Sequence, residues 1–238
     1  MTIEKTNIQK FDEDVNSNTG YIYTTNARLS SFLANKRISE EVIKILPVTT
    51  TSIIDVGCGD GTYTSELKKI NEKINIIGID PSKNAIEAAI KNFPDITFLI
   101  MNLYNKDEII KLPKVQYSVI RGVLHHVSDP YAAIGIVASF SEKMVIMEPN
   151  GNNFILKLIE KNSKYHIEHE EQSFSSKQLT TWCIKSGWKI EQITYIGFVP
   201  FFFPKYLSKI IYFFQPLLER IPLINKYLSA QIVLHCSK

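Results

Sequence analysis

The chain has 238 residues, enough to bury one full hydrophobic core, so a single domain spanning 1–238 is expected. Its formal net charge of +3 comes from lysines and arginines scattered along the sequence, which argues against a nucleic-acid-binding protein. The three cysteines have neither metal-ligand spacing nor an even number for disulfides, which indicates a reducing, cytoplasmic compartment.

Residues 1–46 are expected to form an N-terminal cap of helices before the first strand. Residues 1–16 are polar, so neither a signal peptide nor an N-terminal membrane span is predicted. Tyr21 and Tyr23 either pack against the domain or fold over a ligand as a lid. From 27 to 46 apolar residues recur at helical spacing, and Pro47 ends the pattern.

A glycine-rich loop follows the first apolar strand. Ile53 to Val56 suit a buried parallel strand, and the glycines at 57, 59 and 61 permit positive φ and a close approach of a ligand to the backbone. A helical pattern begins at Thr62, so the free N–H groups of its first turn point back at the loop. Strand, glycine loop and helix are the opening unit of a Rossmann-like domain. Thr62 stands where the dinucleotide fingerprint needs its third glycine, which weakens an NAD-binding interpretation.

The second and third strands also end in polar residues. Residues 74–79 form an apolar run that ends at Asp80, whose carboxylate can accept hydrogen bonds from two ribose hydroxyls. Pro81 and Ser82 open the next helix, and a third strand over 96–101 ends at Asn102 and Leu103.

The spacing of Asp55 and the three glycines, together with Asp80, resembles the first motifs of class I S-adenosylmethionine (SAM) methyltransferases. The resemblance implies an α/β, Rossmann-like fold with a seven-stranded, mostly parallel sheet, an antiparallel last strand and helices on both faces. It implies SAM as the cofactor and a role for Asn102, where relatives carry an acid, in accepting from the adenine amino group. The implied cofactor site consists of Asp55, Gly57, Cys58, Gly59, Asp80, Pro81, Asn102, Leu103 and Arg121.

The fourth strand, 115–120, runs into Arg121 and a segment that resembles the "LHH" turn of many small-molecule methyltransferases. It lacks the Asn/Asp-Pro-Pro-aromatic segment of nucleic-acid amino methyltransferases, so base methylation is not expected. His125 and His126 either shape this turn and the cofactor pocket or act in catalysis, and the structural interpretation is preferred.

Candidate catalytic residues follow the fifth strand, 143–147. Glu148 and Asn150 stand at its carboxyl end, where polar side chains face the ligand crevice of a parallel sheet, and are expected on the substrate side. His166 and His169 belong to a dense His/Glu block at 165–171. No third metal ligand is fixed by spacing, so no metal site is predicted. We expect His166 or His169 to act as a general base, with Glu148 as an orienting partner.

Residues 198–229 form an apolar insert between the expected sixth and seventh strands, 188–197 and 230–236. Apolar residues recur there at helical spacing, but prolines and charges leave no uncharged run of the ~18 residues that a membrane span needs. The insert is either a helical cap or homodimer surface, which is slightly preferred, or an interfacial helix with Lys205 and Lys209 at its border that reaches a lipid-borne substrate.

The resemblance therefore predicts a SAM-dependent methyltransferase, with O-methylation of a small-molecule, glycan-linked or lipid-linked acceptor as the expected reaction. Two alternatives stay open: an NAD-dependent oxidoreductase and a non-catalytic SAM-binding membrane or partner module. The expected location is cytoplasmic, with peripheral contact at the inner face of the membrane through 198–229.

Overall fold

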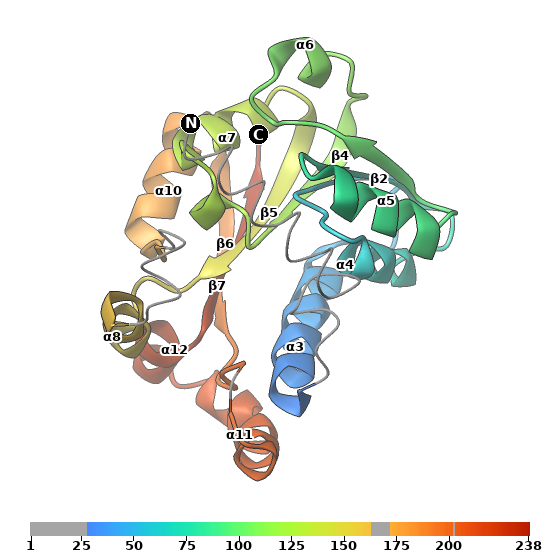
Figure 1. Ribbon diagram of the computed structural model, residues 1–238. Coiled ribbons are helices and arrows are strands. Elements are labelled where there is room, and N and C mark those ends of the chain that lie inside the picture. The colour runs from blue at the N-terminus through green and yellow to red at the C-terminus, as the bar shows by residue number, and fades with distance from the viewer. Residues whose placement is uncertain (1–27, 163–171, 202) are drawn as a thin grey trace.

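A computed structural model describes residues 28–162, 172–201 and 203–238. Its centre is one seven-stranded sheet in the order β3-β2-β1-β4-β5-β7-β6 (Figure 1). The strands are β1 (Ser52–Val56), β2 (Asn75–Asp80), β3 (Thr97–Ile100), β4 (Val115–Arg121), β5 (Ser141–Pro149), β6 (Lys189–Ile196) and β7 (Gln231–Ser237).

Strands β1 to β5 pair in parallel, and β7 runs antiparallel between β5 and β6. This confirms the expected fold class, including the antiparallel last strand. Because β6 is also antiparallel to β7, it runs in the same direction as β5. Pro149 pairs with Gln231, and Gln231 pairs with Ile196, so β6 ends at the same edge as β5. This carboxyl edge is where ligands bind in open α/β sheets.

Two apolar layers cover the two faces of the sheet, as expected for strands buried on both sides. Adjacent β1 residues face opposite ways: Ile53 packs in one core cluster and Ile54 in the other. The first cluster includes residues of α3 (Leu29–Ile45) and α5 (Lys83–Asn92), and the second those of α7 (Pro130–Val137) and α10 (Ser176–Lys185). The other α-helices are α4 (Thr62–Glu66), α6 (Lys106–Ile109), α8 (Phe154–Asn162), α11 (Lys205–Leu218) and α12 (Pro222–Leu228).

Helix starts follow their capping residues. The Ser175 hydroxyl accepts from the Gln178 N–H while the Gln178 side chain accepts from the Ser175 N–H, a capping box that begins α10. Asp129 caps α7 ahead of Pro130. These caps satisfy N–H groups that have no partner within the helix.

The insert at 198–229 forms α11 and α12, which lie with α8 at one end of the molecule, next to the N-terminal half of α3 (Figure 1). Within the described ranges, no helix is both long and apolar enough to cross a bilayer. Tyr21 and Tyr23, expected either to pack against the domain or to fold over a ligand, lie outside the described residues.

Candidate functional site

The glycine loop leaves β1 with three glycines at positive φ: Gly57 at 73°, Gly59 at 55° and Gly61 at 78°. The Gly57 and Cys58 N–H groups both donate to the Ile79 carbonyl of β2, at 2.8 and 3.1 Å. A Cβ built on Gly57 would lie 2.3 Å from a Val123 methyl. The loop is therefore fixed to β2 and packed against the segment after β4, and Gly57 is needed for both its φ and its close packing.

Asp80, at the end of β2, lies directly under this loop. Its carboxylate accepts hydrogen bonds from the Gly59 N–H at 3.0 Å and the Ser82 N–H at 2.8 Å. Only 8% of the residue is exposed. These two contacts fix the orientation of the carboxylate. This arrangement fits the predicted role of Asp80 toward the ribose of SAM.

Asp55 lies deeper, on the side of the sheet that α3 covers. Its carboxylate accepts from the Thr64 hydroxyl at 2.6 Å, and burial raises its pKa to about 6. Arg121, at the end of β4, stacks on the Tyr63 ring at 3.6 Å and donates to the Ser39 hydroxyl of α3. Asp55, Arg121, Tyr63 and Ser39 line a cavity of about 10 Å³, room for one water at most. Cofactor contacts of Asp55 and Arg121 stay predictions.

The other predicted cofactor residues surround the ends of β1, β2 and β3. The Asn102 side-chain oxygen accepts from the Tyr104 N–H at 2.9 Å and shapes the turn after β3. Leu103 is buried, while Pro81 is exposed. Burial raises the pKa of the Cys58 thiol well above its ordinary value, so the thiol stays protonated and serves as packing.

Glu148, at the carboxyl end of β5, organises the segment after β4. It is fully buried, and one carboxylate oxygen accepts from the Val123 and Leu124 N–H groups at 2.9 and 2.7 Å. The other oxygen lies 2.6 Å from Nδ1 of His125. The sequence paired Glu148 with His166 or His169, which lie outside the described residues; among the described ones its histidine partner is His125. The sequence could have suggested the His125–Glu148 pair, because the two residues follow or end β4 and β5, which are neighbouring strands with their carboxyl ends at the same edge.

The expectation that Asn150 faces the substrate is corrected by its contacts. Its amide nitrogen donates to the carbonyls of Lys226 and Ser229 at 3.0 and 3.1 Å, and its amide oxygen accepts from the Asn152 N–H. The amide nitrogen thus attaches the end of α12 to the end of β5, and the amide oxygen holds the turn that follows β5. A fully buried amide needs such partners, which explains its position.

The methyltransferase-domain family model matches residues 48–195, which contain the glycine loop, Asp80 and the His125–Glu148 contact. The chain belongs to this family. Membership of this family sets the NAD-dependent alternative aside, and it agrees with the S-adenosylmethionine cofactor expected from the glycine loop and Asp80.

A curated relative is the release factor glutamine methyltransferase of Buchnera aphidicola subsp. Acyrthosiphon pisum (strain APS), 29% identical over 136 residues. The match covers 54% of this chain and 46% of the relative, so the chain spans less than half of that protein's length.

Solved structures share the fold. A SAM-dependent methyltransferase from Archaeoglobus fulgidus aligns with a TM-score of 0.58 at 16% identity, over 84% of this chain and 93% of that one. The plantazolicin methyltransferase in complex with SAH aligns with a TM-score of 0.64 at 15% identity, over 99% of this chain and 95% of that one. At these identities the likeness shows the fold, while the acceptor has to be inferred from this methyltransferase's own site.

No cluster of three or more metal-ligating side chains is found in the described part of the chain, and the block at 165–171 lies outside it.

Proposed function

We propose that this methyltransferase transfers the methyl group of SAM to a hydroxyl of a small or lipid-linked acceptor. The observation that carries the proposal is the His125–Glu148 pair at the carboxyl edge, on the segment that packs against Gly57. A hydroxyl acceptor must lose a proton near neutral pH, and imidazole is the side chain whose ordinary pKa, about 6.5, suits that step.

SAM supplies an electrophilic sulfonium methyl, so the protein's main task is to align the acceptor and remove its proton. When His125 donates its Nδ1–H to Glu148, the neutral ring carries its basic lone pair on Nε2. Nε2 would accept the proton that the acceptor hydroxyl loses on methylation. The buried Glu148 carboxylate stabilises the resulting imidazolium.

Asp80 and the glycine loop form the cofactor side of the site. The Asp80 carboxylate is held by two N–H groups and so presents a fixed acceptor, which favours ribose hydroxyls without rearrangement of the loop. Asn102 and Leu103, at the adjacent end of β3, are proposed to hold the adenine.

Four histidine variants test the proton acceptor. His125→Gln should lower the rate at saturating SAM by about a hundredfold or more, the usual contribution of a general base. His166→Ala and His169→Ala test the bases predicted from sequence, and His235→Gln on β7 is the control. A His125→Gln enzyme that keeps its rate within a few-fold would remove His125 from this role and leave His166 and His169 as candidates.

The acceptor is sought with methyl-labelled SAM and separate lipid and aqueous extracts. Label in a base-stable lipid product would support an ether on a lipid-linked hydroxyl, and label in an aqueous product a small or glycan-linked acceptor. SAM binding with no transfer to any fraction would favour the non-catalytic module instead. A cytoplasmic location fits the three buried cysteines, which are free thiols.

A further inference from the structure

Helix α11 presents its polar side to the protein and its apolar side outward. Its buried residues are Ser208 and Gln215. Tyr206 is 82% exposed and Phe213 76%. A helix that packed on the sheet as a cap would show the opposite arrangement, because an amphipathic helix buries its apolar stripe against the core.

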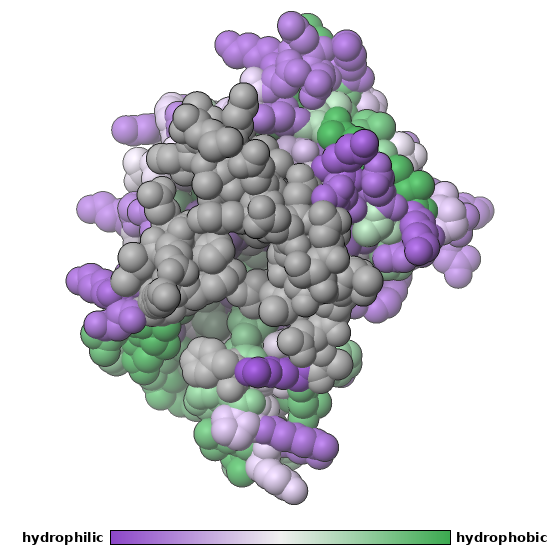
Figure 2. Space-filling view, viewed as in Figure 1, coloured by the Kyte–Doolittle hydropathy of each residue, from purple (hydrophilic) through white to green (hydrophobic). Residues whose placement is uncertain are grey.

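Helices α8 and α12 continue this exposed apolar surface. Neither helix, both lying wholly in the described part of the chain, contains a buried residue. Twelve large apolar side chains from 154–158 and 206–227 are exposed, against nine in the rest of the described chain. Together they form what we call the apolar surface: Phe154, Ile155, Leu158, Tyr206, Leu207, Ile210, Phe213, Phe214, Leu217, Ile221, Leu223 and Tyr227. Hydrophobic residues gather over these helices at the lower end of the molecule in Figure 2.

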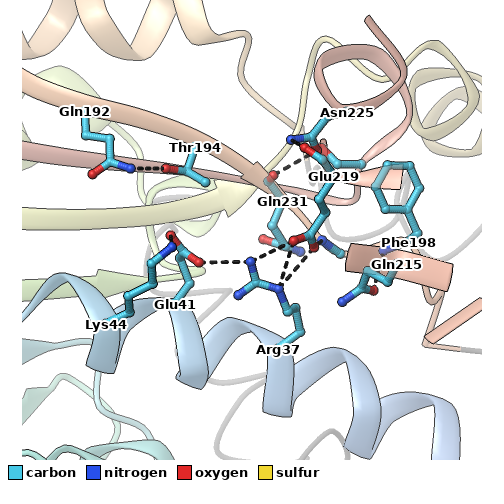
Figure 3. A network of polar contacts seen from close by, with 12 residues as sticks. Arg37, Glu41, Lys44, Gln192, Thr194, Phe198, Gln215, Glu219, Asn225 and Gln231 are labelled. Atoms are coloured by element: carbon cyan, nitrogen blue, oxygen red, sulfur yellow. Dashed lines mark hydrogen bonds and ion pairs between the residues drawn. The ribbon is translucent and has the colours of Figure 1, made fainter. Parts of the chain in front are cut away.

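The surface is held in place by buried polar contacts, so its exposure does not come from a loose segment. Glu219 at the end of α11 accepts from Arg37 of α3 at 2.8 Å and from the Gly197 N–H at 3.0 Å (Figure 3). The Gln215 side chain accepts from the Phe198 N–H at 2.9 Å. These hydrogen bonds all come from the face of α11 that lies against the protein. In a helix that packed as a cap, that face would carry the apolar side chains.

Cations outnumber acids on the two insert helices. Residues 205–228 contain Lys205, Lys209, Arg220 and Lys226 against Glu219, whose carboxylate is paired with Arg37. Lys205 and Lys209 lie one helical turn apart on α11 among the exposed aromatic side chains. Aromatic and aliphatic side chains bordered by lysines are typical of helices that lie in the interface of an anionic bilayer.

The apolar surface lies at the edge of the sheet where the cofactor loop is found. The chain leaves for the insert after Ile196 and returns at Gln231, both level with Pro149 at the carboxyl end of β5. Val56, which precedes the glycine loop, ends β1 at this same edge. Contact with a bilayer through this surface would turn the site toward the lipid.

We propose that this methyltransferase docks peripherally on an anionic lipid bilayer through the apolar surface of α8, α11 and α12. A second copy of the chain is the less suitable occupant. In a two-fold dimer the same face would meet itself, so both copies would bring the excess positive charge of Lys205, Lys209 and Lys226 into one interface, and like charges across an interface disfavour association. In an anionic bilayer the apolar side chains would enter the acyl region, and the lysines around them would pair with the anionic headgroups.

Flotation of the full chain with vesicles tests the proposal without any methyl transfer. The protein should bind vesicles of phosphatidylcholine with about one third phosphatidylglycerol, and bind pure phosphatidylcholine vesicles much more weakly. Phe213→Asp should reduce the partition coefficient about tenfold or more, because one large apolar side chain no longer enters the bilayer. Lys205→Ala with Lys209→Ala should reduce it about fivefold per lysine at low salt.

Ile110→Asp is the matched control, because Ile110 is 83% exposed and follows α6, at the opposite end of the molecule in Figure 1. This variant should bind vesicles like the parent, and SAM binding should be unchanged in all variants. Absence of vesicle binding by the parent, or equal binding by Phe213→Asp and the parent, would overturn the proposal. So would a dimer in sedimentation velocity that Phe213→Asp dissociates, since the surface would then join two copies.

Discussion

The two acids that stand out in the sequence, Asp55 and Asp80, have different surroundings in the fold. Asp80 is held by two N–H groups at the carboxyl edge, whereas Asp55 lies beneath the loop against Thr64 and close to Arg121. The N–H donors hold the Asp80 carboxylate in a fixed orientation, whereas burial raises the pKa of Asp55. The two residues should therefore respond differently to mutation.

Asp80→Ala should weaken SAM binding by about 1–3 kcal/mol, roughly a tenfold to hundredfold rise in Kd, because the ribose loses a charged acceptor and Gly59 loses its anchor. Calorimetric titration measures this change. Asp95→Ala, at an exposed position before β3, is the control and should bind like the parent. Unchanged affinity in a folded Asp80→Ala protein would exclude Asp80 from the site.

Asp55 should make stability fall as the pH rises. Its pKa is about 6 in the folded protein against an ordinary value of 3.8, so the folded state holds this proton more tightly than the unfolded state. The stabilisation is complete below about pH 4 and is lost as the pH rises through about 6, in total about 3 kcal/mol. Asp55→Asn, whose amide oxygen can still accept from Thr64, lacks this titration. The difference in Tm, variant minus parent, should therefore increase between pH 4 and 7. A Tm difference that does not change with pH would contradict the explanation that burial disfavours the Asp55 anion.

At the scale of elements, the glycine loop and the segment after β4 form one packed unit. Val123 contacts Gly57 and donates its N–H to Glu148, which also contacts His125. Displacement of Val123 should therefore disturb both sides of the site. The sequence explains the glycine by positive φ and ligand approach, and the structure adds its close packing against Val123.

Gly57→Ala should weaken SAM binding at least tenfold, since its Cβ would stand 2.3 Å from a Val123 methyl and an L-residue at φ 73° costs about 1–2 kcal/mol. Val123→Ala removes the nearest methyls and should restore part of the loss in the double variant. Titration of the parent, both single variants and the double variant completes a cycle. Strict additivity of the two changes would show that Val123 does not transmit the effect.

At the scale of the whole molecule, cofactor binding should be visible as thermal stability. SAM at a hundredfold its Kd should stabilise the folded protein by about 2.7 kcal/mol, which for 150–250 residues corresponds to a rise in Tm of about 5–10 °C. NAD at the same concentration should leave Tm unchanged. A rise with NAD and none with SAM would reverse the cofactor assignment.

The sequence by itself determined the fold class, the cofactor loop and the acid of β2. Each depends on local chemistry: branched apolar runs, glycines that permit positive φ at 57, 59 and 61, and Asp80 at a strand end. The helical periodicity of the insert is likewise local, and the insert forms the two helices α11 and α12.

Only the tertiary structure decided which groups meet and which face looks outward. Glu148 is 23 residues from His125, and their contact exists because β4 and β5 are neighbours in the sheet. Asn150 is occupied by residues 226–229, which no strand-end pattern could indicate. The sequence slightly favoured a cap or a dimer surface for the apolar stripe of α11 over an interfacial helix, and in the structure Gln215 and Glu219 attach the helix by its polar side. Periodicity shows that a helix has two faces, but only long-range contacts decide which of them is buried.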